Sequence, residues 1–155
     1  MFNLRFEFLK SFDTSIEKRA EYLDATMASH GYKLIGNGKH RRTYLSPNGR
    51  YVLKFPMLAS GIRDNKDEHN TWHMFKNRPS KDGVLYAPCR LIKDFVLMMW
   101  ACSDTCGYSD GCERAIGSGT LKRMSHNIPV WADYIDCQQV GTLLNGKIVA
   151  FDYAP

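Results

Sequence analysis

The sequence lacks the long apolar runs of a membrane protein. No stretch approaches the roughly 20 consecutive apolar residues that a transmembrane helix requires. The opening segment MFNLRFEFLK alternates apolar with polar residues, whereas the core of a signal peptide is continuously apolar. Internal repeats and low-complexity tracts are also missing. These absences predict a protein that stays in the compartment where it is made and has no contact with a membrane.

Cysteines are few and unevenly placed. There are five, an odd number, and no export signal accompanies them, so we expect reduced thiols in a cytosol. Cys102, Cys106 and Cys112 crowd into the segment CSDTCGYSDGC, where zinc would need His126 or Cys137 as a fourth ligand. The segment lacks the paired short knuckles of ordinary zinc modules. The spacing therefore favours free thiols over a zinc site.

The sequence does contain enough apolar residues for one folded domain. Of its 155 residues, 44% are hydrophobic and 12% are aromatic, which is sufficient for a single core. The formal net charge is +5, and a net positive charge favours anionic partners such as phosphates, nucleic acid or acidic proteins. Charge alone does not distinguish between these partners.

The N-terminal region predicts a strand followed by a helix. Apolar and polar residues alternate over residues 2–8, which is the period of a strand with one buried face. Thr14 and Glu17 have the spacing of a capping box, and His30-Gly31 stops the helical pattern. The apolar positions that recur at helical spacing between these limits are Ile16, Ala20, Leu23 and Met27.

Three short β segments follow, with the sequences YKLIG, RRTYL and RYVLKFP. A glycine turn separates the first two, and the segment SPNG, residues 46–49, separates the second from the third. In SPNG the proline presets φ and the glycine accepts a positive φ, so the flanking strands are expected to be antiparallel neighbours. The pattern predicts a three-stranded meander.

A second helix is predicted after Pro56 by the segment IRDNKDEHNTWHMFKN, and Pro79 ends it. Glu68, Trp72 and Phe75 share one face of this helix because they are spaced by four and three residues. A carboxylate is therefore expected on the side of the helix that turns inward.

Two hairpins complete the pattern. The segments APCRLI and FVLMMWAC are separated by Lys93-Asp94, and the second is continuously apolar, as in a strand buried on both faces. Near the C-terminus, LLNGKIVAFDYAP has Asn145-Gly146 between apolar runs, which is a strong hairpin signal. It also places Asp152 just after a buried strand.

The order of these elements resembles the small lobe and nucleotide cleft of a protein kinase. The segment GNGKHRRTYLSPNGRYVLKFP resembles the glycine loop and following strands of phage-encoded serine/threonine kinase-like proteins, and QVGTLLNGKIVAFDYAP resembles their catalytic-loop hairpin. The resemblance implies one α+β domain over 1–155. It would comprise an N-terminal strand and helix (1–31), an antiparallel sheet of about five strands with a C-helix (32–101), and a Cys-rich stretch and catalytic-loop-like hairpin forming a much reduced large lobe (102–155).

The resemblance also implies a set of nucleotide-binding residues. Gly36 and Gly38 would let the backbone close over nucleotide phosphates. Lys54 stands where the lysine of a kinase contacts the α- and β-phosphates of ATP, and Glu68 would hold that lysine in an ion pair. Arg41 takes the place of the third glycine, where it would either reach phosphate or block its close approach.

A second set of residues would bind Mg²⁺ and carry the chemistry. Asp152, in the segment DYA, stands where kinases have the metal-binding aspartate of Asp-Phe-Gly. The catalytic stretch departs from the kinase pattern because neither Asp133 nor Asp136 has an asparagine five residues further on. The resemblance then implies Gln139 as the metal-site substitute and Asp133 or Asp136 as the base, although metal geometry tolerates this exchange poorly.

Each of these candidates has a structural alternative. A Gly-x-Gly spacing occurs in ordinary tight turns, and Lys54 is equally compatible with a solvated strand lysine. Asp67 competes with Glu68 as the acidic partner. A strand-end aspartate such as Asp152 often only caps a turn. The direction of these side chains in the folded chain decides between the alternatives.

Three functional hypotheses follow. The first is a non-catalytic kinase-like module that binds a host or virion protein in the host cytoplasm, with ATP in the cleft, and the altered catalytic stretch favours it. The second is a minimal ATP- and Mg²⁺-dependent serine/threonine phosphotransferase. The third and least favoured is a nucleic-acid-binding domain. Its surface would comprise Lys39, His40, Arg41, Arg42, Tyr44 and Tyr51, whose basic part is otherwise a solvated hairpin tip.

Overall fold

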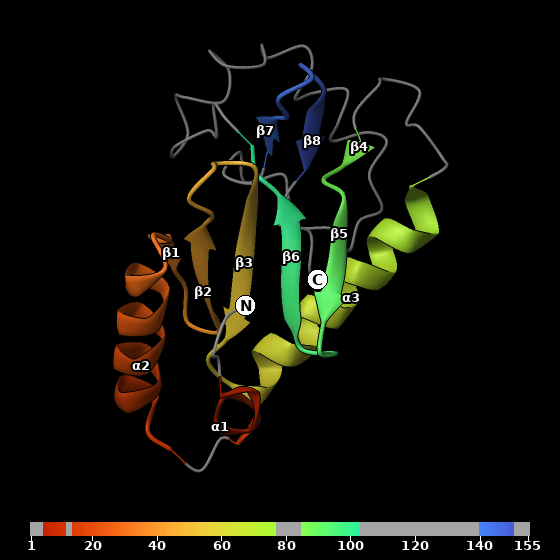
Figure 1. Cartoon of the computed structure of the whole chain (residues 1–155). Helices are drawn as coiled ribbons and strands as arrows, with labels where there is room; N and C mark the ends of the chain where they lie inside the picture. Colours follow the sequence, from red (N-terminus) through yellow and green to blue (C-terminus); the bar gives the residue numbers. More distant parts are fainter. Residues whose placement is uncertain (1–4, 12–13, 77–84, 103–139, 151–155) are drawn as a thin grey trace. The chain divides into compact units, whose positions relative to one another are not determined.

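The computed structural model describes residues 5–11, 14–76, 85–102 and 140–150. The helices in these parts are α1 (Phe6–Lys10), α2 (Ile16–Ser29) and α3 (Ala59–Phe75). The strands there are β1 (Lys33–Asn37), β2 (Arg41–Leu45), β3 (Tyr51–Pro56), β4 (Leu85–Tyr86), β5 (Cys89–Ile92), β6 (Val96–Trp100), β7 (Val140–Thr142) and β8 (Ile148–Ala150). Figure 1 shows their arrangement.

The chain divides into two compact units. The first comprises Met1–Lys66 and Arg90–Met99, and the second comprises Asp67–Cys89 and Trp100–Pro155. The division falls inside α3, which contributes its N-terminal half to the first unit and its C-terminal half to the second. The predicted partition into 1–31, 32–101 and 102–155 stays a prediction.

A five-stranded sheet dominates the first unit, with the strand order β1-β2-β3-β6-β5. The pairs β1–β2 and β2–β3 are antiparallel, which confirms the predicted meander. Figure 1 shows β3 and β6 running in opposite directions. Together with the helices, this sheet confirms the predicted α+β class and the antiparallel sheet of about five strands.

The turn between β2 and β3 forms as the sequence predicts. Gly49 has a φ of 67°, the left-handed conformation that glycine adopts without strain. The Asn48 side-chain oxygen accepts hydrogen bonds from the Ser46 hydroxyl (2.8 Å) and from the Arg50 backbone N–H (3.1 Å). The Ser46 hydroxyl oxygen in turn accepts a bond from the Tyr51 N–H (3.1 Å). These bonds fix the register of the two strands.

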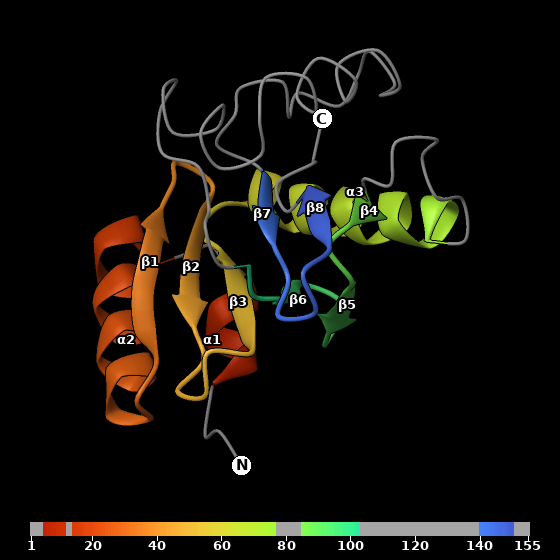
Figure 2. The ribbon, with the colours of Figure 1, turned by 90° about the horizontal axis from the view of Figure 1, so that it is seen from above.

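One face of the meander packs against the N-terminal helices. Figure 2 shows α2 lying beside β1, and these two elements are in contact. Leu23 and Met27 of α2 are fully buried, as the helical spacing predicts, whereas Ile16 at the start of the helix is 44% exposed. The buried core of this unit comprises Leu9, Leu23, Met27, Tyr32, Tyr44, Leu53, Phe55, Met57, Phe95 and Val96.

The prediction of a strand over residues 2–8 is wrong where the structure describes the chain. Residues 6–10 form α1, with the helical hydrogen bonds from Leu9 N–H to the Arg5 carbonyl (3.1 Å) and from Ser11 N–H to the Glu7 carbonyl (3.0 Å). Contacts distant in sequence stabilise this short helix: the Tyr22 hydroxyl accepts a bond from the Arg5 N–H (2.9 Å). Tertiary packing therefore overrides the local alternation of apolar residues.

Arg19 of α2 provides hydrogen-bond donors for the carbonyl groups at the C-terminal end of α1. Its guanidinium donates hydrogen bonds to the carbonyl oxygens of Leu9 and Ser11, and the residue is only 1% exposed. Burial lowers the pKa of this guanidinium. A helix end leaves carbonyls without an intrahelical partner, and here a buried arginine supplies the missing donors.

The N-cap of α2 lies one residue later than predicted. Ser15, rather than Thr14, adopts the cap position, and its hydroxyl oxygen accepts a hydrogen bond from the Lys18 N–H at 3.4 Å. The helix ends at Ser29, and Gly31 follows with a φ of 76°. The predicted stop at His30-Gly31 is thus confirmed, because glycine accepts the left-handed conformation that ends a helix.

The β5–β6 hairpin closes the sheet at its other edge. Lys93 and Asp94 both adopt positive φ, 53° and 64°, which confirms the turn predicted at this pair. Val96, Leu97 and Met99 of β6 are buried, whereas Trp100 at the end of the strand is 53% exposed. The prediction of a strand buried on both faces therefore holds for all but its last residue and the partly buried Met98.

The second unit contains a three-stranded sheet with the order β4-β8-β7. Strands β7 and β8 form an antiparallel hairpin, visible in Figure 2, and β4 pairs with β8 in parallel. Gly146 in the connecting turn has a φ of 79°, which confirms the hairpin predicted from Asn145-Gly146. In the parts of the chain that the structure describes, no helix is long and apolar enough to cross a membrane.

Candidate functional site

The strand pairings place two of the predicted nucleotide-binding residues, Gly36 and Lys54, on one face of the five-stranded sheet. Gly36 of β1 lies opposite Thr43 of β2, and Thr43 lies opposite Lys54 of β3. Directly opposite residues of neighbouring strands project from the same face of a sheet. The three residues therefore form a row across three strands, which we call the lysine row. The structure brings together Gly36 and Lys54, which are far apart in sequence.

An irregularity in β1 puts Gly36 in this row. The register shifts between Leu34 and Gly36, so that Ile35 forms a bulge and is 51% exposed. A Cβ atom on Gly36 would lie 3.3 Å from the Cβ of Thr43, a tight contact. Glycine therefore keeps the first strand close to the second and leaves the surface beside Thr43 uncovered by a side chain.

Lys54 is the buried cation of the row. It is 5% exposed, so the alternative of a solvated strand lysine is wrong. Its neighbours in β3, Leu53 and Phe55, belong to the apolar core on the other face of the sheet. A buried ammonium group is costly unless anionic or hydrogen-bonding groups compensate it. Lys54 therefore lies on the face opposite the main core, in a partly polar setting.

Asn65 of α3 connects the strand of Lys54 to the rest of the unit. Its side-chain N–H₂ donates to the backbone carbonyls of Lys54 (2.9 Å) and Phe95 (2.8 Å), and the residue is fully buried. Its side-chain oxygen accepts a hydrogen bond from the Arg41 guanidinium at 3.3 Å. One amide thus joins α3, β2, β3 and the residue that precedes β6.

The predicted glycine turn between β1 and β2 is held against the segment that leads into α3. Gly38 N–H donates to the Arg41 carbonyl at 3.0 Å, which closes the turn. The His40 carbonyl accepts a bond from Met57 N–H at 2.7 Å. Gly61, in the first turn of α3, approaches so closely that an added Cβ would lie 2.3 Å from the His40 carbonyl oxygen. The end of the turn is therefore anchored by backbone contacts.

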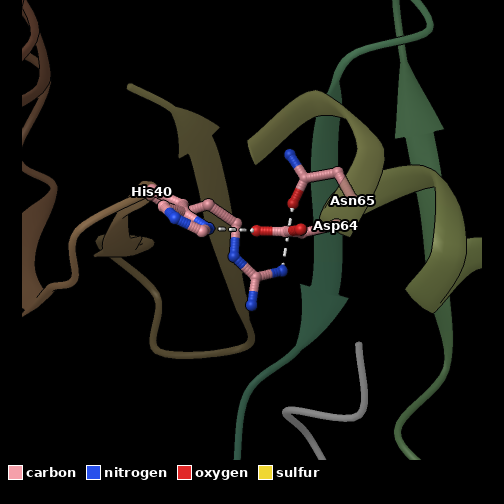
Figure 3. A network of polar contacts seen from close by, with 4 residues as sticks. His40, Asp64 and Asn65 are labelled. Carbon is pink, nitrogen blue, oxygen red and sulfur yellow. Dashed lines mark hydrogen bonds and ion pairs between the residues drawn. The ribbon is translucent and has the colours of Figure 1, made fainter. Parts of the chain in front are cut away.

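Two side-chain contacts reinforce this anchor. Figure 3 shows the His40 ring facing the Asp64 carboxylate, with Nδ1 and Oδ2 3.0 Å apart. The side chain of His40 is 39% exposed and that of Asp64 15% exposed. Beside this pair lies Asn65, which binds Arg41. We refer to His40, Arg41, Asp64 and Asn65 as the turn clasp.

The remaining predicted site residues are only partly described. Glu68, the predicted partner of Lys54, is fully buried on α3 in the second unit, as expected for a residue on an inward face, whereas Asp67 is partly exposed. The predicted base and metal-binding residues, Asp133, Asp136, Gln139 and Asp152, lie outside the described residues. Their roles stay predictions.

The possible zinc ligands fall largely outside the description as well. The structure describes Cys102, whose Sγ lies 4.0 Å from the Trp100 carbonyl oxygen, while Cys106, Cys112, His126 and Cys137 lie outside the described residues. Among the residues that the structure describes, no three His, Cys, Asp or Glu side chains are grouped as metal ligands would be. The preference for free thiols in the Cys-rich segment stays a prediction.

Tyr44, one of the two predicted stacking residues, is buried and offers no face for stacking on a base. Tyr44 is 1% exposed, and its hydroxyl donates to Asp24 at 2.6 Å. Burial, followed by the hydrogen bond to Asp24, raises the pKa of this phenol. Asp24 also forms an ion pair with Arg42. The Tyr51 hydroxyl lies 2.7 Å from that of Tyr32. These side chains stabilise the fold instead.

Sequence reasoning missed Thr43, Asp64 and Asn65. Asn65 precedes Glu68 by three residues, so helical spacing already places both on one face of α3. That signal was available from the inward-facing pattern of the helix. The position of Thr43 beside Gly36 depends on the strand register, and the register depends on the bulge at Ile35. No local pattern in the sequence predicted that bulge.

Comparisons with known proteins give structural similarity only. No protein-family profile and no curated protein matches the chain. The chain aligns with the streptomycin-ATP-APH(2")-IIa ternary complex at 18% identity and a TM-score of 0.46, over 76% of this chain and 41% of that chain. It aligns with a GDP complex of a mutant aminoglycoside 2'-phosphotransferase-IIIa at 16% identity and a TM-score of 0.41, over 72% and 42%. The chain spans less than half the length of either structure.

Proposed function

We propose that this chain is a kinase-like module that binds ATP, with Mg²⁺, on the sheet face that carries the lysine row. The observation that supports the proposal is the register that aligns Gly36, Thr43 and the buried Lys54 across three strands. The alignment puts Gly36, where the backbone can approach a ligand closely, on the same sheet face as Lys54, whose positive charge attracts phosphate.

The chemistry of the row fits a polyphosphate ligand. An ammonium group forms strong, charge-assisted hydrogen bonds with phosphate oxygens. In a partly buried setting the attraction is stronger than in water, because the effective dielectric constant is lower. Glycine in the neighbouring strand and turn lets backbone N–H groups reach the remaining oxygens. The overall charge of +5 attracts the same anion from a distance.

In this proposal Glu68 is the acidic partner of Lys54, and Asp152 with Gln139 binds Mg²⁺. Full burial of Glu68 supports its role, because a buried carboxylate requires a compensating cation or hydrogen bonds. If the metal is bound there, it would neutralise charge on the phosphates. These three assignments rest on the sequence resemblance.

The proposal favours a module without phosphotransfer that binds a host or virion protein in the host cytoplasm. The altered catalytic stretch around Asp133 and Asp136, which lacks the asparagine of a kinase, supports this form. Incubation with γ-labelled ATP and host lysate tests the alternative, a minimal phosphotransferase. Labelling that disappears in both Lys54→Ala and Asp152→Ala would favour the enzyme. Labelling that survives both changes would belong to a contaminant.

Thermal denaturation with increasing Mg²⁺-ATP tests nucleotide binding. A ligand that binds only the folded state stabilises it by RT ln(1 + [L]/Kd), or about 2.7 kcal/mol at a hundredfold excess over Kd. We expect the melting temperature of the wild type to rise with ATP. Lys54→Met should abolish the rise, and Lys33→Met, a change at an exposed lysine of β1, should keep it. A wild-type melting temperature that does not change at millimolar ATP would refute the proposal.

A further inference from the structure

The turn clasp adds side-chain links between two parts of the proposed site that the β2–β3 ladder already holds side by side. Residues 38–40 form the turn between β1 and β2, whereas Lys54 lies on β3. The contacts His40–Asp64 and Arg41–Asn65 link this turn to α3. Asn65 then continues the link to the Lys54 carbonyl. The relative position of turn and lysine therefore depends on α3 as well as on the β2–β3 ladder.

Both amide hydrogens of Asn65 are used in this arrangement. Its two amide hydrogens serve two carbonyls and its oxygen serves Arg41. Aspartate has nearly the same shape but offers no donors, so it would repel both carbonyls. Leucine would leave both carbonyls without this donor. Only an amide of this length satisfies all three partners at once.

The turn clasp includes Arg41, one of the predicted phosphate-binding residues. The sequence leaves open whether Arg41 reaches phosphate or blocks its approach. In the structure its guanidinium is held by Asn65 at the base of the turn. The hydrogen bond of 3.3 Å is long for this type of contact. Arg41 thus links the turn to α3.

From these contacts we propose that Asn65, acting through the turn clasp, is a positioning residue of the nucleotide site, an inference that rests on the proposed function. It touches no ligand itself. It fixes the glycine turn and the lysine strand at the separation that a polyphosphate chain spans. Loss of the clasp then weakens the contacts to phosphate, while contacts to the nucleoside are unchanged.

The test compares the affinities of ATP and adenosine in the full chain by isothermal titration calorimetry. Asn65→Ala is the direct variant, and Asn70→Ala is its control because Asn70 is an exposed asparagine on the same helix. Both proteins are measured well below their melting temperatures, after circular dichroism confirms that they are folded. We expect Asn65→Ala to lower the affinity for ATP by about tenfold relative to adenosine, and Asn70→Ala to leave the ratio unchanged.

A second variant keeps the inference testable should Asn65→Ala fail to fold. Asp64→Ala removes only the partly exposed contact to His40 and leaves the buried bonds of Asn65 intact. It should lower the ratio of ATP to adenosine affinity in the same direction by a smaller factor. Equal losses for both ligands, or unchanged affinities in every folded variant, would overturn the inference while the proposed function stands. Absence of ATP binding to the wild type would instead refute the proposed function.

Discussion

At the scale of single residues, the buried guanidinium of Arg19 gives a direct test of the N-terminal packing. We expect Arg19→Met to lower the free energy of unfolding by about 2–4 kcal/mol, because the carbonyls of Leu9 and Ser11 lose their donors. Urea denaturation measures the change. Arg63→Met, at an exposed position of α3, should change it by less than about 0.5 kcal/mol. Equal effects of the two variants would contradict this role of Arg19.

His69 on α3 predicts a dependence of stability on pH. Burial, followed by the positive charge of the neighbouring His73, lowers the pKa of His69 from its ordinary value of 6.5, and Lys76 acts in the same direction. The two histidine rings lie with their centroids 4.4 Å apart. Between the folded and unfolded pKa values the unfolded chain binds more protons, so stability falls as the pH drops through 6.5.

A variant isolates this contribution from other titrating groups. We expect the melting temperature of the wild type, relative to that of His69→Gln, to decrease between pH 7.5 and pH 5.5. The glutamine keeps a polar side chain but does not titrate in this range. A difference that stays constant with pH would show that protonation of His69 does not oppose folding.

At the scale of elements, the junction between the glycine turn and α3 depends on Gly61. Alanine favours a helix over glycine by about 1 kcal/mol, so helix propensity alone predicts that Gly61→Ala stabilises the protein. The added Cβ would lie 2.3 Å from the His40 carbonyl oxygen and 3.1 Å from Pro56. We therefore expect a loss of about 1–3 kcal/mol in denaturation experiments.

Gly49→Ala provides the contrast for this prediction. Nothing lies within 4 Å of a Cβ added there, and only the positive φ of 67° opposes alanine. The cost should be about 1 kcal/mol, from the backbone alone. A stabilised Gly61→Ala protein would show that α3 moves away from the turn without cost, and the clasp would then not be rigid.

Most elements of the fold follow from local patterns in the sequence. The segment RRTYL predicts β2 at its observed bounds, and the turns at residues 46–49 and at Asn145-Gly146 form where their chemistry requires. These features depend on neighbouring residues only. Helix α1 does not, because its ends are satisfied by Tyr22 and Arg19 from α2. The alternation of apolar residues over 2–8 cannot indicate those partners, because they lie in a later helix.

The residues of the candidate site also differ in whether local sequence patterns predict them. Gly36 and Lys54 were predictable, since each stands at a characteristic place in the strand pattern. Asn65 was not identified because its role depends on Arg41, Lys54 and Phe95, which are distant in the sequence. Asparagine within a helix usually lies on the solvated face. Its full burial here depends on three partners that only the folded chain brings together.

At the scale of the whole molecule, three arginines serve the fold. Arg19 is buried, Arg42 is paired with Asp24, and Arg41 binds Asn65. Because Asp24 is already subtracted in the net charge of +5, its pairing with Arg42 leaves that charge unchanged. The nucleotide proposal therefore depends on the local position of Lys54 and not on the net charge.

Affinity labelling with an acyl phosphate of ATP tests the central claim most directly. The reagent acylates a lysine amine beside the nucleotide phosphates: an amide bond forms, the acyl–phosphate bond breaks and ATP leaves. Mass spectrometry then locates the modified lysine. We predict modification of Lys54 that excess Mg²⁺-ATP suppresses, with Lys33 either unmodified or unaffected by ATP. An unmodified Lys54, or modification that ATP does not suppress, would contradict the proposal that this sheet face binds the nucleotide.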